Sequence, residues 1–143
     1  MSLTVVVADD SEEYRLIVQA LLRSLDTVRV VGEAADGAEA LALVRREHPN
    51  LLITDLVMPR LDGIELTRYV REESPQTMII LMSSYTEDAY RLMASDSGAD
   101  AFVNKNVLTS SLLLAVQDVV RRRSEGSGGS PPPFIGGSSA QAK

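Results

Sequence analysis

Apolar positions in the first 123 residues follow two different spacings. Short runs of apolar and β-branched residues, typical of buried strands, recur at residues 5–8, 28–34, 51–53, 78–82 and 101–103. Between these runs, apolar residues recur every three or four positions, as they do on one buried face of a helix. The pattern therefore predicts five strands that alternate with five helices.

Capping residues mark the ends of the predicted helices. Residues that fit the N-cap position precede four of them: Ser11, Asp36, Asp62 and Thr86. Gly98 fits a left-handed C-cap after the fourth helix, and Pro49 and Pro75 close the second and third. The apolar stripe of the first helix predicts one buried face, formed by Tyr14, Ile17, Val18, Leu21, Leu22 and Leu25.

The alternation of strands and helices predicts the fold class. We expect an α/β fold with a doubly wound, five-stranded parallel sheet of flavodoxin-like order 2-1-3-4-5 and helices on both faces. Crossovers in such sheets are right-handed, and ligands bind at the carboxyl ends of the strands.

Composition changes sharply after residue 123. Of the 20 residues from 124 to 143, 13 are Gly, Ser or Pro, and such a segment buries too little apolar surface to offset the entropy of ordering it. We therefore predict a folded domain at 1–123 and a flexible linker or tail at 124–143. Phe134 and Ile135 form the only apolar pair in that tail.

Overall composition excludes several classes of chemistry. The 143 residues include 20 acids and 14 bases, for a net charge of −6, which argues against direct nucleic-acid binding by this segment. There is no Cys, and His48 is the only His, so disulfides, thiolate nucleophiles and His-based metal sites are not expected. No apolar run approaches membrane-spanning length and no signal segment begins the chain, which predicts a cytoplasmic protein without membrane contact.

Chemically active side chains follow the predicted strands. The set comprises Asp9, Asp10, Asp55, Ser83 and Lys105. On a parallel sheet these groups would meet at one edge, where two carboxylates ~4 Å apart repel by about 4 kcal/mol at an effective dielectric constant of about 20. Mg²⁺, which prefers hard oxygen ligands, would relieve that repulsion. A carboxylate beside Mg²⁺ and a lysine could attack phosphorus and form an acyl phosphate, with a hydroxyl such as that of Ser83 donating a hydrogen bond.

These segments resemble bacterial response-regulator receiver domains. The Asp55-x-x-Met58-Pro59-x-x-Asp62-Gly63 motif is similar to the family's phosphoacceptor segment. The remaining motifs, similar to its acidic pair, its switch-hydroxyl strand and its lysine strand, lie at residues 7–11, 81–84 and 98–105. The resemblance covers residues 3–123.

The resemblance implies a role for each site residue. Asp55 would accept a phosphoryl group from a phosphohistidine of a sensor histidine kinase, and Lys105 would pair with that group. Mg²⁺ would be held by Asp10 directly, by Asp9 largely through water, by Asp55, and by the backbone carbonyl of Val57. The protein would then be a signalling switch rather than an enzyme with turnover, although it would catalyse its own phosphoryl transfer.

The same resemblance implies a conformational switch. Ser83 would move toward the phosphoryl group and Phe102 would turn inward behind it, which would reshape the face formed by helix 4, strand 5 and helix 5. In the family that face serves signalling and homodimerisation. Ser83 replaces the commoner Thr. Val57 and Tyr85, which flank the entry to the site, are bulky and mostly apolar, so we predict slow loss of the phosphoryl group.

Three alternatives remain open at this point. A pseudo-receiver would signal by binding alone, although the complete site set argues against it. An aspartyl-phosphate hydrolase generally carries a second acid two residues after the nucleophile, where this chain has Val57. Helix 5 and residues 104–106 look somewhat like receivers that precede a helix-turn-helix domain, so the chain could be a fragment of a transcriptional regulator or a single-domain regulator.

Overall fold

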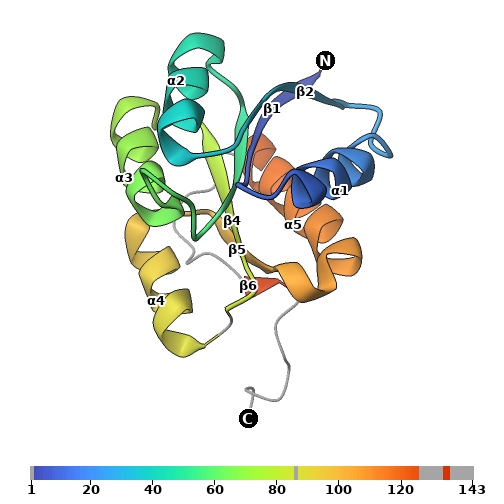
Figure 1. The fold of residues 1–143 in the computed structure, drawn as a ribbon. Helices are drawn as coiled ribbons and strands as arrows, with labels where there is room; N and C mark the ends of the chain where they lie inside the picture. Colours follow the sequence, from blue (N-terminus) through green and yellow to red (C-terminus); the bar gives the residue numbers. More distant parts are fainter. Residues whose placement is uncertain (1, 86, 126–133, 136–143) are drawn as a thin grey trace.

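Strands and helices alternate along the chain, as the hydrophobic pattern predicts (Figure 1). The structure is a computed structural model and describes residues 2–85, 87–125 and 134–135. Its strands are β1 (Leu3–Ala8), β2 (Val28–Ala34), β3 (Leu51–Asp55), β4 (Met78–Ser83), β5 (Ala101–Asn104) and β6 (Phe134–Ile135). Its helices are α1 (Glu12–Leu22), α2 (Gly37–Glu47), α3 (Gly63–Glu73), α4 (Asp88–Ser97), the 3-10 turn η1 (Lys105–Val107) and α5 (Leu108–Glu125).

The strands form one parallel sheet in the order β2-β1-β3-β4-β5-β6. The first five strands have the predicted order 2-1-3-4-5. β1 and β3 are central and fully buried over most of their length, because helices cover both faces of the sheet there.

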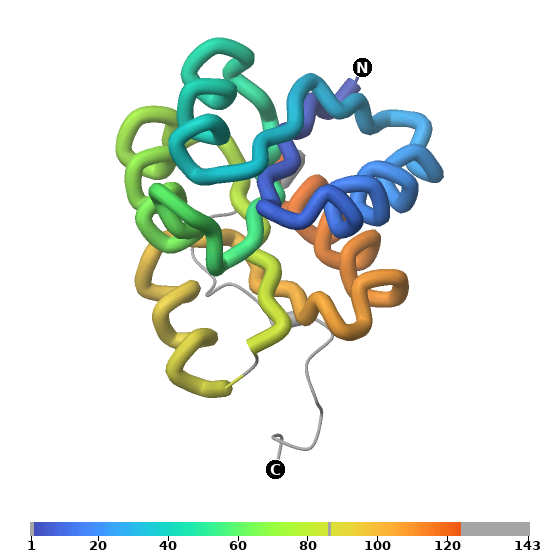
Figure 2. The backbone as a smooth tube through the Cα atoms, viewed as in Figure 1, coloured from blue at the N-terminus to red at the C-terminus, as the bar shows by residue number. Residues whose placement is uncertain are grey.

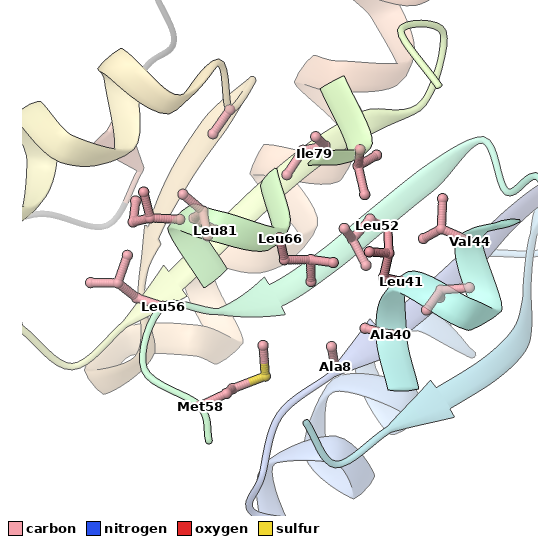
Figure 3. Packing of buried hydrophobic residues seen from close by; sticks show 14 of the residues in the cluster. Ala8, Ala40, Leu41, Val44, Leu52, Leu56, Met58, Leu66, Ile79 and Leu81 are labelled. Carbon is pink, nitrogen blue, oxygen red and sulfur yellow. The ribbon is translucent and has the colours of Figure 1, made fainter. Parts of the chain in front are cut away.

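Two apolar clusters hold the layers together. One lies between the sheet and α2, α3 and α4, and Figure 3 shows its side chains, including Leu52, Leu66 and Leu81, pointing toward one another. The other lies between the opposite face of the sheet and the helices α1 and α5. Figure 2 shows that α1 and α5, from opposite ends of the folded chain, lie side by side, and this contact joins the first and last helices.

The first helix differs from its prediction. It ends at Leu22, so Leu25 packs on the core from the following loop. Ile17 is 38% exposed rather than buried, because the sheet and α5 cover only the side of α1 that carries Val18 and Leu22. No helix in the described ranges is both long enough and apolar enough to cross a membrane.

The predicted caps are confirmed at three N-termini. The side chains of Ser11, Asp36 and Asp62 accept backbone N–H groups at the starts of α1, α2 and α3. Helix α4 instead begins after Glu87, which makes no side-chain capping bond, and Thr86 lies outside the described residues. Gly98 ends α4 with a left-handed φ of 100°, as its position predicts.

A sixth strand was not expected from the sequence. Phe134 and Ile135 pair in parallel with Phe102 and Val103, at the edge of β5 that would otherwise be unpaired. Aromatic and β-branched residues suit such an edge, and backbone pairing there satisfies open hydrogen-bonding groups. This pair lies within the segment 124–143 that the composition predicts to be a flexible linker or tail, and α5 continues two residues past the predicted boundary to Glu125. The other predicted tail residues, 126–133 and 136–143, lie outside the described residues.

Candidate functional site

The carboxyl ends of four strands carry the polar side chains singled out from the sequence. Asp9 follows β1 directly, Asp55 is the last residue of β3, and Ser83 is the last residue of β4. Lys105 follows β5 as the first residue of η1. Because all these strands are parallel, the groups share one edge of the sheet.

Lys105 lies between two carboxylates. Its Nζ is 2.8 Å from Oδ2 of Asp9 and 3.3 Å from Oδ1 of Asp55. The lysine and both acids are buried, with Asp9 fully inaccessible and Lys105 8% exposed. Water therefore screens these charges weakly, and each buried charge is stabilised mainly by the opposite charges next to it.

The two adjacent acids at the end of β1 differ in environment. Both oxygens of the Asp9 carboxylate are engaged, since Oδ1 accepts the backbone N–H of Ser11 at 2.9 Å and Oδ2 accepts Lys105. Asp10 is exposed. Asp10 is thus the acid of the pair that a ligand can reach from solvent; the direct and water-mediated metal roles of the pair remain predictions.

The loop after Asp55 is held close to the strand end. The N–H of Leu56 donates to the carbonyl of Met82 at 2.8 Å, which continues the sheet pairing beyond β3. A Cβ at Gly63, the first residue of α3, would lie 2.2 Å from the carbonyl oxygen of Asp55. Only glycine lets α3 begin this close to the acid, so Gly63 helps to fix the position of the Asp55 backbone.

Burial and charge shift the titration of this cluster. Burial, with the negative charge of Asp9, raises the pKa of Asp55 from 3.8 to about 6, against the opposing effect of Lys105. Burial alone would lower the pKa of Lys105, but its hydrogen bond to Asp9 and the charge of Asp55 more than reverse this, so its pKa is raised. The site therefore keeps its lysine charged and makes the ionisation of Asp55 costly, mainly through burial and secondly through the charge of Asp9.

The acids fit a divalent cation. One oxygen from each of Asp9, Asp10 and Asp55 can be chosen so that all three lie within 4.8 Å of one another. With Lys105 the cluster has a net charge of −2 when every group is ionised, and its donors are hard oxygens. These residues match the ligand preference of Mg²⁺. The carbonyl of Val57 remains a predicted ligand.

Added Mg²⁺ is expected to raise the melting temperature, because an ion that binds only the folded chain stabilises it by mass action. The Asp10→Asn variant is expected to lose most of this rise, and its melting temperature without metal is expected to change little because Asp10 is exposed. Differential scanning fluorimetry over a Mg²⁺ titration checks this. An equal rise in Asp10→Asn and the unmodified protein would exclude the acidic cluster as the source.

Residues at the mouth of the site have defined places. Ser83 is buried, and its Oγ accepts the N–H of Tyr85 at 2.8 Å. Val57 and Tyr85 are each about half exposed, at 50% and 51%. Phe102 is 4% exposed and packs in the cluster beneath α4. Phe102 already lies inside in this conformation, so the expected inward turn must start from a different one.

Sequence reasoning missed two residues that contact the site. Tyr14 places its ring beneath the lysine, with Nζ of Lys105 3.9 Å from the ring centroid. Arg15 donates to the carbonyl of Asp9 at 2.6 Å and pairs with Glu33. The helical spacing marked Tyr14 only as a core residue, and nothing in the local sequence relates it to a lysine from the other end of the domain.

The sequence comparisons agree on one family. The model of the response regulator receiver domain matches residues 5–117. Response regulator protein VraR of Staphylococcus aureus is 31% identical over 121 residues, which cover 85% of this chain and 58% of that protein. VraR of Staphylococcus epidermidis is 32% identical over 117 residues, which cover 82% and 56%. The chain thus spans a little more than half the length of these curated relatives.

Solved structures show the same architecture. The signal receiver domain of NarL from Mycobacterium tuberculosis has a TM-score of 0.79 and 34% identity, covering 84% of this chain and 97% of that one. RcsB in complex with DNA has a TM-score of 0.79 and 25% identity, covering 92% of this chain and 64% of that one. Both similarities cover more than four fifths of this chain.

Proposed function

The chain belongs to the response regulator receiver domain family, and on that premise we propose that it is a phosphorylation-activated switch whose phosphoacceptor is Asp55. The phosphoryl donor in this proposal is a phosphohistidine of a sensor histidine kinase in the cytoplasm. The observation that supports it best is the position of Asp55, buried at a strand end, 3.3 Å from the lysine ammonium and within one cluster with Asp9 and Asp10.

The proposed reaction is a phosphoryl transfer between two side chains. An oxygen of the Asp55 carboxylate attacks phosphorus, the P–N bond of the phosphohistidine breaks, and its electron pair returns to the imidazole. An acyl phosphate forms on Asp55. Lys105 would neutralise charge on the transferred group. Asp10, Asp55 and the carbonyl of Val57 would hold Mg²⁺ directly and Asp9 largely through water, and the bound ion would supply further charge neutralisation.

Intact-mass measurement after incubation with Mg²⁺ and a small phosphodonor tests this proposal. We expect the protein to gain one phosphate, and the gain to be absent from Asp55→Asn and from samples treated with EDTA. A known receiver domain, labelled in parallel, serves as the positive control. If that control is labelled and this chain gains nothing at Asp55, the chain is a pseudo-receiver that acts by binding alone.

The switch would act through residues that connect the site to the surface. The Ser83 oxygen accepts the N–H of Tyr85 at 2.8 Å, so a movement of the Ser83 side chain toward a phosphoryl group on Asp55 would disturb this bond. Tyr85 stacks on Tyr90 of α4, with ring centroids 5.3 Å apart, so movement of Ser83 would be passed to that helix. We propose the face of α4, β5 and α5, with Phe102 beneath it, as the signalling and homodimerisation surface; β6 pairs with β5 at this face in the structure, so a partner that binds along β5 must displace β6.

The output proposed for the switch is control of a separate DNA-binding domain. RcsB, one of the structural neighbours, is described in complex with DNA, and the chain covers 64% of that structure. A receiver unit that controls a separate DNA-binding domain therefore fits the comparisons. With its net charge of −6, this segment itself is not expected to bind nucleic acid.

The phosphorylated form is expected to be long-lived, because an attacking water needs a polar group to orient it and both half-exposed flanking positions offer bulky side chains. Val57→Asn is expected to shorten the lifetime severalfold by supplying such a group. Loss of phosphate is followed by intact mass after removal of the donor. Leu92→Asn, a substitution at an exposed position on α4, serves as the control. Loss of phosphate from the unmodified protein within seconds would contradict the prediction of a long lifetime.

A further inference from the structure

We propose that Tyr14 is a positioning residue for phosphoryl transfer, and that the face of its ring holds the Lys105 ammonium against the reacting carboxylate. This inference rests on the proposed role of Asp55. Its basis is the short distance of 3.9 Å between Nζ of Lys105 and the centroid of the Tyr14 ring. A cation over an aromatic face at this distance is attracted by the negative potential of the ring.

Three neighbours of negative charge or potential surround the ammonium. Lys105 donates to Asp9 at 2.8 Å, lies 3.3 Å from Asp55, and rests on the ring of Tyr14. An ammonium group has three N–H donors, and a lysine reaches its place on a flexible four-carbon stem. The ring therefore adds a third constraint to a side chain that two carboxylates alone would hold less firmly.

The backbone of Tyr14 is linked to the acidic site by hydrogen bonds. The N–H of Ser11 donates to Oδ1 of Asp9 at 2.9 Å, and Oγ of Ser11 accepts the N–H of Tyr14 at 3.3 Å. Since the other oxygen of Asp9 accepts Lys105, the contacts form a closed circuit that runs Asp9, Ser11, Tyr14, Lys105 and back to Asp9. The ring also packs on the buried cluster between the sheet, α1 and α5, so it has little freedom to move.

An aromatic ring suits this position for a chemical reason. When a phosphoryl group forms on Asp55, its oxygens need the N–H donors of Lys105. A carboxylate in place of Tyr14 would compete for those donors as a strong acceptor, whereas a ring attracts the charge without taking a conventional hydrogen bond. Tyr14 can thus keep the Lys105 ammonium in place while the N–H donors of Lys105 change from carboxylate oxygens to phosphoryl oxygens.

Two substitutions distinguish an electrostatic effect of the Tyr14 ring on Lys105 from an effect of side-chain packing. Tyr14→Phe keeps the ring and Tyr14→Leu replaces it with an aliphatic group that still covers the core. We expect Tyr14→Phe to gain phosphate from a small phosphodonor at nearly the unmodified rate, and Tyr14→Leu to be slower by about tenfold, a loss within the range of a desolvated cation–π contact. Equal rates in Tyr14→Leu and the unmodified protein would overturn the inference, as would equal losses in both variants.

A double-variant cycle tests whether Tyr14 acts through the lysine. In a Lys105→Gln background, Tyr14→Leu is expected to cause no further loss of rate, because the ring then has no cation to hold. A full additional loss there would overturn the inference. If the unmodified protein is not labelled at all, the proposed function of Asp55 fails, which is a different result from normal labelling of Tyr14→Leu.

An NMR measurement provides a readout that does not depend on phosphorylation. The chain has only two lysines, Lys105 and Lys143, so selective lysine labelling gives a simple spectrum. The methylene protons next to Nζ of Lys105 are expected to be shifted upfield by the ring current, and this shift is expected to persist in Tyr14→Phe and disappear in Tyr14→Leu. Random-coil shifts for both lysines of the unmodified protein would overturn the inference even if a variant failed to fold.

Discussion

At pH 8 the Asp55→Asn variant is expected to be more stable than the unmodified protein by about 3 kcal/mol, although it can no longer be phosphorylated. The folded state raises the pKa of Asp55 to about 6 from 3.8, so the folded chain binds this proton more tightly than the unfolded chain does. The unmodified protein therefore loses stability as the pH rises from about 4 to 6, and the loss is complete above that range. An asparagine at position 55 does not titrate, so the variant does not lose this stability as the pH rises.

Chemical denaturation at pH 4 and at pH 8 measures this effect. The shift in pKa, which already includes the opposing effect of Lys105, corresponds to about 3 kcal/mol. The gain is expected to be small at pH 4, where the folded carboxyl is protonated and the unfolded one is only partly ionised. Asp96→Asn, at an exposed position on α4, removes one charge away from the site and serves as the control. A destabilised Asp55→Asn at pH 8 would show that the buried acid is not under strain.

The Lys105→Gln variant is expected to gain phosphate more slowly by about a hundredfold, because a preorganised charge next to the transferred group is lost. It is also expected to lose about 3 kcal/mol of stability in the absence of metal. The cause of the second effect is Asp9, which is fully buried and takes the ammonium at 2.8 Å. Removing one partner of a buried pair leaves the other charge without compensation.

The double variant Asp9→Asn with Lys105→Gln separates these two effects. Neutralising Asp9 removes the uncompensated charge, so most of the lost stability is expected to return, whereas the rate of labelling is expected to stay low. Urea denaturation and intact-mass kinetics on the same samples measure both quantities. A single variant Lys105→Gln as stable as the unmodified protein, or labelled as fast, would contradict the role given to the lysine.

Strand runs and helix caps follow from the local sequence, whereas the width of the buried face of a helix depends on tertiary packing. The strand runs and the capping residues were readable because each depends on neighbours within a few positions: Asp36 and Asp62 cap helices through bonds to residues three positions later. Ile17 shows the limit of this reasoning. Its spacing fits the buried stripe of α1, but the width of the covered face depends on how α5 and the sheet pack there, and Ile17 lies outside it.

β6 shows the same limit at the other end of the chain. The composition of 124–143 describes a segment that cannot build a core of its own, which is a statement about average burial. Pairing of Phe134 and Ile135 with β5 needs no core, since it uses an edge that the rest of the fold supplies. A local count of apolar residues contains no information about that edge.

The sequence by itself determined the order of strands and helices, the parallel sheet, and the presence of Asp9, Asp10, Asp55, Ser83 and Lys105 at its carboxyl edge, because periodicity and strand ends are local properties. Only the tertiary structure decided which of these groups are buried, which are exposed, and which contact one another. It buried Asp9 and left Asp10 exposed, set Lys105 between two acids, and brought the ring of Tyr14 against the ammonium. These relations join residues from opposite ends of the domain, and the packing of α1 and α5 on one face of the sheet fixes them to within a few ångströms.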